Sequence, residues 1–164
     1  MKTLLLILAA LPVFAQQQVG YIASTGAVSL TSTATVATLQ QPTTGSTAVT
    51  FPAYPSPGAT IYCSAACTAT LYRTGAAATA TAGTVNAVNQ AQPASSVQFF
   101  TASNGGTSGA VTLAVFSIAA GATQNVDLSQ FTLGATNLGT TNITIGIASV
   151  TATVNITFFP REVH

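Results

Sequence analysis

Residues 59–73 read A-T-I-Y-C-S-A-A-C-T-A-T-L-Y-R and hold both cysteines of the chain, Cys63 and Cys67. Apolar and polar residues alternate on both sides of the cysteines, a pattern typical of strands with one buried face. A turn at residues 64–66 would place the two cysteines opposite each other, at a Cα separation of roughly 4.5–5.5 Å that suits a disulfide. We therefore predict a β-hairpin closed by a Cys63–Cys67 disulfide. Free thiols and two ligands of a metal site are the alternatives.

The alternation also divides the side chains of this predicted hairpin between two faces. One face is apolar and is expected to point into a core: Ile61, Cys63, Cys67, Ala69 and Leu71. The other carries hydroxyl groups and is expected to point toward solvent or a partner: Thr60, Tyr62, Thr68, Thr70 and Tyr72. Tyr62 and Tyr72, with Tyr54 in the proline-rich stretch before the hairpin, form a candidate platform for stacking sugar rings. Ordinary packing of tyrosines on a sheet is the alternative.

The first fifteen residues have the features of a secretory signal peptide. Lys2 supplies a positive charge, an apolar run follows, and small residues precede a cleavage point after Ala15. Removal of 15 of the 164 residues would leave 149, the size of one ordinary domain. We predict a secreted, periplasmic or extracellular protein, and an oxidising compartment agrees with a disulfide. The predicted organisation is a leader at 1–15, one domain at 16–160 and a tail at 161–164.

The rest of the chain reads as short strands separated by turns. Residues 142–148 and 150–159 alternate clearly and predict two adjacent strands joined near Ser149. In residues 110–119, Val111, Leu113 and Val115 share a face and the alternation shifts near Phe116. About eight to ten short strands without a convincing helix predict an all-β antiparallel β-sandwich. A jelly-roll or Greek-key arrangement is favoured over an immunoglobulin-like one, because the Cys-Trp-Cys spacing is absent.

Charge is almost absent and excludes several classes of partner. The chain has three Lys or Arg, two Asp or Glu and a formal net charge of +1, which falls to zero when Lys2 leaves with the leader. A basic patch for nucleic acid and a polybasic segment for anionic lipid are both missing, so neither partner is expected. Near-zero net charge also gives little protection against self-association.

The residues needed for catalysis or cofactor binding are also missing. Asp127 and Glu162 are the only acidic side chains, and the single histidine, His164, is the last residue. A carboxylate pair, an activated serine, a zinc site and a calcium site each need more such groups. We therefore predict a protein that is not an enzyme, with no catalytic residue, no metal and no cofactor. Asp127 is expected to cap a turn or to bind Arg73, with a ligand contact as the alternative.

Two further patterns bear on the surface. Asn142-Ile-Thr and Asn155-Ile-Thr match the N-glycosylation pattern, but both lie in predicted strands and are interpreted as chance matches. Strands rich in Thr and Ala have few of the charged residues that protect sheet edges. Such edges serve strand addition or assembly, unless loops cover them.

These observations favour a secreted, non-catalytic structural protein that forms a homo-oligomer or an extracellular assembly. A secreted carbohydrate-binding or adhesion module that uses the surface tyrosines is the second hypothesis. A small outer-membrane β-barrel is the third, and integral membrane association is not expected, because tryptophan is absent and the C-terminus is polar.

Overall fold

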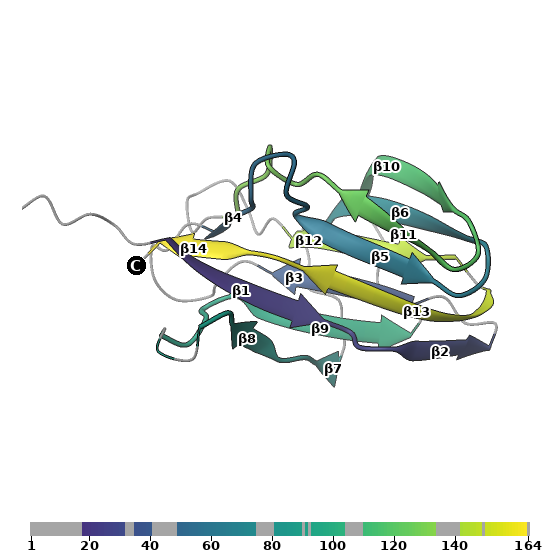
Figure 1. Cartoon of the computed structure of the whole chain (residues 1–164), viewed down its shortest axis with the longest axis horizontal. Helices are drawn as coiled ribbons and strands as arrows, with labels where there is room; N and C mark the ends of the chain where they lie inside the picture. The colour runs from purple at the N-terminus through teal and green to yellow at the C-terminus, as the bar shows by residue number, and fades with distance from the viewer. Residues whose placement is uncertain are drawn as a thin grey trace, which may run out of the picture.

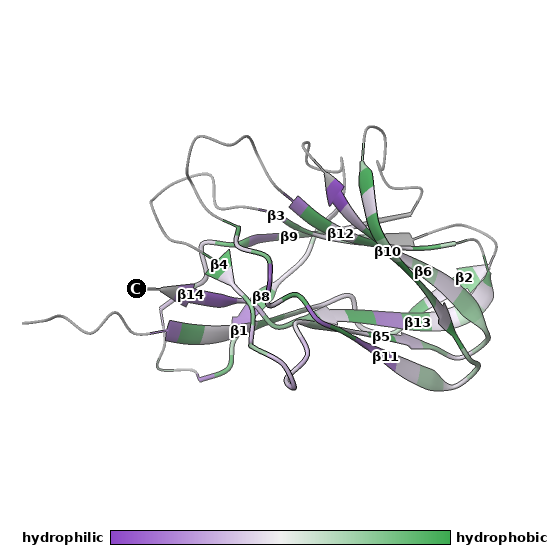
Figure 2. Ribbon diagram, turned by 90° about the horizontal axis from the view of Figure 1, so that it is seen from above, coloured by the Kyte–Doolittle hydropathy of each residue, from purple (hydrophilic) through white to green (hydrophobic). Residues whose placement is uncertain are grey.

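The computed structural model of the chain confirms the all-β prediction. Two antiparallel sheets pack face to face as a β-sandwich (Figures 1 and 2). The predicted leader at 1–15 lies outside the described part of the chain. The described residues are 18–31, 35–40, 49–74, 81–89, 91, 93–103, 110–133, 142–148 and 150–163.

The first sheet is nearer the viewer in Figure 1 and has eight strands. They are β1 (Gln18–Ser24), β2 (Val28–Thr31), β4 (Val49–Thr50), β5 (Ala59–Cys63), β8 (Val85–Ala87), β11 (Ala122–Val126), β13 (Thr151–Phe158) and β14 (Arg161–Val163). Their order is β11-β5-β13-β1-β14-β4, with β2 paired to β13 and β8 paired to β1.

The second sheet lies behind the first and has six strands. They are β3 (Thr35–Gln40), β6 (Cys67–Thr74), β7 (Thr81–Ala82), β9 (Gln98–Ser103), β10 (Val111–Ile118) and β12 (Asn142–Ile147). Their order is β10-β6-β12-β3-β9-β7. The described residues thus form more strands than predicted, because several have only two to four residues.

The core fills the space between the sheets, and the alternation of each strand decides which side chains enter it. From β13, Val154, Ile156 and Phe158 are buried, while the residues between them are partly exposed. The rings of Phe158 and Phe99 meet edge to face across the sheets, with centroids 6.3 Å apart. Burial of these large apolar side chains is the main stabilising term of the sandwich.

The predicted hairpin is wrong, although the residues predicted for its apolar face are all buried. Strand β5 pairs with β11 and β13 in the first sheet, whereas β6 pairs with β10 and β12 in the second. The three residues between Cys63 and Cys67 therefore carry the chain from one sheet to the other. The physical reason is that two strands can bury the same alternating side chains either side by side or face to face across a core.

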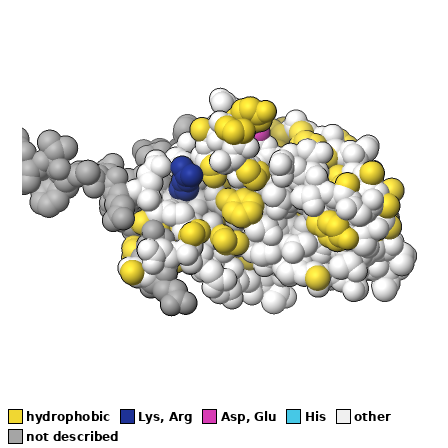
Figure 3. Space-filling view, viewed as in Figure 1, with side chains coloured by type: hydrophobic (Ala, Val, Ile, Leu, Met, Phe, Trp, Pro, Cys, Tyr) yellow, Lys and Arg dark blue, Asp and Glu magenta, His cyan; other side chains and the backbone are white. Residues whose placement is uncertain are grey.

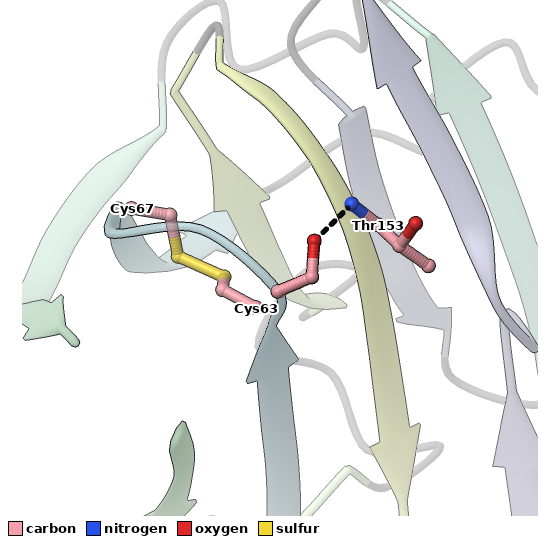
Figure 4. Close-up of a disulfide and its surroundings, with 4 residues drawn as sticks. Cys63, Cys67 and Thr153 are labelled. Atoms are coloured by element: carbon pink, nitrogen blue, oxygen red, sulfur yellow. Dashed lines mark hydrogen bonds between the residues drawn. A yellow bond between two sulfur atoms is a disulfide. The ribbon is translucent and has the colours of Figure 1, made fainter. Parts of the chain in front are cut away.

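The disulfide is confirmed at this crossing. Cys63 and Cys67 are bonded, with a Cα separation of 6.4 Å, and both side chains lie in the core. Ser64 continues the ladder with β13: its N–H donates to the Thr153 carbonyl at 2.8 Å, and its Oγ accepts from the Thr153 N–H at 2.8 Å (Figure 4). The disulfide therefore joins the end of β5 in the first sheet to the start of β6 in the second. The hydrogen bonds of Ser64 hold the crossing against β13 of the first sheet.

Other short connections also cross between the sheets. The turn from β10 to β11 passes through Gly121, whose φ of 70° favours glycine over residues with a side chain. The connection from β12 to β13 crosses as well, so the prediction that residues 142–148 and 150–159 pair is wrong. Residues 110–119, 142–148 and 150–159 contain strands as predicted, but none of these strands pairs with the strand that follows it in the sequence.

The predicted C-terminal tail is also wrong in part. Residues Arg161–Val163 form β14, which pairs with β1 and β4. Strand β13 ends before Pro160, but the Pro160 carbonyl accepts a hydrogen bond of 2.9 Å from the Tyr21 N–H, and pairing resumes directly after it. The domain therefore extends past the predicted boundary at residue 160.

Opening the disulfide is expected to lower stability modestly. Replacing Cys63 and Cys67 together by alanine frees a loop whose ends are four residues apart. The chain-entropy model assigns about 2 kcal/mol to a loop of this length. Urea unfolding should show that loss for the double variant and a similar loss for the reduced wild-type protein. An unchanged unfolding midpoint in both samples would show that the crossing forms without the covalent link.

Candidate functional site

The structure separates the two tyrosines that were predicted to share a face. Tyr62 follows buried Ile61 on β5 and points outward from the first sheet, beside Thr123 and Asn155. Tyr72 follows buried Leu71 on β6 and points outward from the second sheet. Because the sheets pack through their inner faces, the two rings lie on opposite sides of the molecule. The predicted platform of Tyr54, Tyr62 and Tyr72 therefore does not form.

Tyr54 lies in the proline-rich loop between β4 and β5 and is 80% exposed. Its peptide bond to Pro55 is cis. Pro52, Ser56 and Pro57 of the same loop line a groove of about 710 Å³. Of the three predicted tyrosines, Tyr54 is thus the one whose loop borders a concave surface.

The groove lies on the outer face of the first sheet, where β1, the end of β13 and the start of β14 meet. Its walls are mainly apolar, with Ile22, Val88 and Phe159 beside the loop prolines, and Arg161 and Gln18 add polar groups. In Figure 3 hydrophobic side chains gather over these strands and charged side chains are sparse. A concave, apolar surface with a few polar groups is the usual form of a binding site for a small ligand.

Hydroxyl and amide groups cover the outer face of the first sheet beyond the groove. Ser24 Oγ donates to Asn155 Oδ1 at 3.0 Å and lies 2.9 Å from Thr157 Oγ1. Thr157 Oγ1 also donates to Asn155 Oδ1, at 3.1 Å. These groups partly satisfy one another and leave an uncharged polar surface.

The most exposed apolar residues of a regular strand lie on β10, at the edge of the second sheet. Val111, Leu113 and Val115 are 49%, 37% and 59% exposed. The alternation shifts between Thr112 and Ala114, where the ladder with β6 has a bulge, and not near Phe116 as predicted. Ala114 and Phe116 consequently pack against the core. Within the described residues, β10 pairs with β6 alone, so its other backbone edge has no strand beside it.

Glu162, predicted to lie in a tail, is fully buried. Its carboxylate accepts hydrogen bonds from the N–H of Ser96 at 3.0 and 3.1 Å, from Ser96 Oγ at 2.7 Å and from the Val97 N–H at 3.3 Å. The Ser95 hydroxyl donates to it as well. Glu162 belongs to β14 in the first sheet, whereas residues 95–97 lead into β9 in the second. The carboxylate therefore ties the two sheets together.

Tyr21 belongs to the same buried cluster. Its hydroxyl donates to the Pro93 carbonyl at 2.9 Å, so it holds the segment that also binds Glu162. Burial raises the pKa of Tyr21, and the Glu162 carboxylate raises it further. The neutral, hydrogen-bonded tyrosine is the form that this environment stabilises. The donors and acceptors are satisfied within the chain, which indicates a structural cluster.

Asp127 caps a turn, as one of its predicted roles required. Its Oδ1 accepts a hydrogen bond of 2.9 Å from the Ser129 N–H, and this bond holds the pKa of the exposed carboxyl below its usual value.

Of the two asparagines in the glycosylation patterns, Asn142 has a fully buried side chain. A glycan on Asn142 is incompatible with this fold, which agrees with the interpretation as a chance match. Asn155 Oδ1 is engaged by Ser24 and Thr157.

Sequence reasoning missed Glu162 because the segment after Pro160 is too short to show a period. Arg161 is exposed and Glu162 is buried, but a pattern of this length also occurs in tails. The signal that could have found Glu162 is its charge, because the chain has only two acidic residues. The role of Glu162 is visible only in the fold, which brings Ser95 and Ser96 to it from 67 and 66 residues away.

Comparison with known proteins finds no matching family model, no similar curated protein and no similar solved structure. No helix of the described residues is long and apolar enough to cross a membrane.

Replacing Glu162 by glutamine keeps the size of the side chain but is expected to lower the unfolding free energy markedly. The amide turns an NH₂ group toward a cluster of donors and removes the charge that strengthens their hydrogen bonds. The expected loss of unfolding free energy is about 2–3 kcal/mol. Asp127→Asn, which removes the exposed carboxylate, is the matched control and should change the urea midpoint little. Equal midpoints for the two variants would contradict the role assigned to Glu162.

Proposed function

We propose that the protein is an exported, non-catalytic structural protein that associates with copies of itself. The observation that carries the proposal is the β10 edge, which has eight residues, three exposed apolar side chains and no charged residue. Edge strands of proteins that remain monomeric are usually short, charged, bulged, interrupted by proline or covered. In the described residues β10 has one of these protections, the bulge between Thr112 and Ala114.

The unpaired edge of β10 favours strand addition. Among the described residues no strand pairs with its outward N–H and C=O groups, and a second strand would form a ladder with them. Each paired backbone bond adds only about 1 kcal/mol net, but burial of the exposed Val115 side chain adds apolar area. Main-chain pairing with burial of alternate side chains is the general mode of β-augmentation.

The charges of the chain support association. Arg73 and Arg161 are exposed on different sheets, and Asp127 is exposed beyond the end of β11. Among the described residues these side chains form no basic or acidic patch, so copies of the chain meet little electrostatic repulsion. The predicted leader at 1–15 and the Cys63–Cys67 disulfide support an exported protein.

A charge on β10 is expected to prevent association. Val115→Lys places a cation at the exposed centre of the edge and leaves the core unchanged, because the side chain is 59% exposed. Light scattering on a sizing column over a hundredfold concentration range should show association of the wild type and a monomeric variant. Val88→Lys, at a valine that is 65% exposed away from β10, is the matched control and should associate as the wild type does. A wild type that stays monomeric throughout would refute the proposal.

Carbohydrate binding is a second candidate function, and the groove beside Phe159 favours it. The Phe159 ring offers an apolar surface for stacking, and Arg161 and Gln18 offer hydrogen-bond donors at the same groove. Tyr54 is exposed on the loop that forms one wall. This arrangement replaces the predicted Tyr62 and Tyr72 platform with a different surface.

Variants in and away from the groove test the second candidate. Phe159→Ala and Tyr54→Ala are expected to weaken retention on an immobilised neutral polysaccharide, the former by roughly tenfold. Tyr72→Ala, on the opposite face, is the matched control and should leave retention unchanged. Absence of wild-type retention on a broad polysaccharide panel would rule out this candidate, as would equal losses from all three variants.

A further inference from the structure

We infer that the self-association is a closed, two-fold dimer in which β10 pairs antiparallel with β10 of a second copy. This inference rests on the proposed function and specifies its geometry. Three observations carry it: the unequal edges of the sandwich, the absence of charge on β10 and the position of the bulge.

The sandwich has one long open side and one side with short strands (Figure 1). At the far end of the second sheet from β10, the edge strand β7 has two residues. The first sheet ends on that side in β2, β4 and β8, which have four, two and three residues. Strands of this length offer too few backbone groups for stable pairing with another copy. Association through β10 therefore uses the available long edge.

Strand β11 lies on the same side as β10 but is protected. It has five residues, and its sequence Ala-Thr-Gln-Asn-Val is mostly polar. Gln124 Nε2 donates to the Asn125 carbonyl at 2.6 Å, and the exposed carboxylate of Asp127 follows the strand. Polar side chains and a charge of this kind discourage edge-to-edge pairing. The contrast between the two strands places the interface on β10.

The absence of charge identifies a second copy as the occupant. Antiparallel pairing about a two-fold axis sets each residue of β10 against a residue of the same strand. A charged residue near the axis would meet its own copy, and like charges opposite each other destabilise a sheet. Strand β10 reads Val-Thr-Leu-Ala-Val-Phe-Ser-Ile, so no such repulsion arises. A charged partner would find no complementary group on it.

The bulge sets the register of the pairing. From Ala114 to Ile118 the ladder between β10 and β6 is regular, whereas it is shifted at Leu113. A two-fold axis at Phe116 pairs this regular run with itself, so that Ala114 lies opposite Ile118 and Val115 opposite Ser117. The two residues of each pair lie on the same face of the sheet, as paired residues must. Ala114, Phe116 and Ile118 point to the core side, while Val115 and Ser117 point outward.

The proposed dimer is closed. Once the two β10 strands pair, the second sheets of both copies form one continuous sheet, and its outer edges are the two short β7 strands. An isologous contact consumes the same surface on both copies and leaves no free copy of it. The mass of the assembly is therefore expected to stop at twice that of the monomer.

Light scattering of the wild type over a hundredfold concentration range separates this inference from the proposed function. A mass that reaches twice the monomer mass and stays there is the expected result. A mass that keeps rising would overturn the closed dimer and leave self-association standing. A monomer at every concentration would overturn both. A dimer that Val115→Lys does not weaken would overturn the β10 interface alone.

Cysteine cross-linking tests the register in the full chain. A mixture of Val115→Cys and Ser117→Cys proteins, oxidised with copper phenanthroline, is expected to give a disulfide-linked heterodimer, because directly opposed residues lie within disulfide reach. Each variant alone should cross-link several-fold less, since its own copies are then displaced by two residues. Thr81→Cys on β7 is the control for the opposite edge and should stay uncross-linked. Efficient cross-linking through Thr81→Cys, or none in the mixture, would overturn the inferred geometry.

Discussion

The crossing of the chain between the two sheets at Cys63–Cys67 is the constraint on which the arrangement of this protein depends. Three residues join β5 in the first sheet to β6 in the second, and the disulfide keeps both strand ends in the core. Ser64 holds the crossing to β13 through both its backbone and its hydroxyl. Strand β10 pairs with β6 and strand β11 pairs with β5, so the turn between them crosses the sandwich beside the disulfide crossing. Both sheets therefore end on this side, in the edge strands β10 and β11.

A buried carboxylate ties the sheets together elsewhere in the sandwich. Glu162 accepts hydrogen bonds from Ser95, Ser96 and Val97, so neutral donors surround its buried carboxylate. Burial of a charge costs free energy unless hydrogen bonds compensate it, so the cluster requires all of its donors. Tyr21 holds the adjacent Pro93 and completes the link between β1, β14 and the segment that leads into β9. The protein thus uses one of its few charges inside the fold.

The surface that remains has little charge and two features suited to contacts. The β10 edge offers backbone groups and exposed valines, and the groove beside Phe159 offers apolar walls with Arg161. They lie on different sheets, so pairing through one leaves the other accessible. An assembled protein that presents a ligand groove on each copy is compatible with both surfaces.

The all-β class and the buried face of residues 61–71 could be predicted from the sequence, because alternation records which residues avoid water. The disulfide could be predicted as well, because the chain has two cysteines at a spacing that permits it. Ile61, Cys63, Cys67, Ala69 and Leu71 are buried as their spacing predicts. Strand pairing could not be predicted in the same way, because a hairpin and a crossing between two sheets bury the same alternate side chains and leave the same pattern. Only the tertiary structure therefore places Tyr62 and Tyr72 on opposite faces, brings Glu162 to Ser95 and Ser96, and puts β10 at an edge.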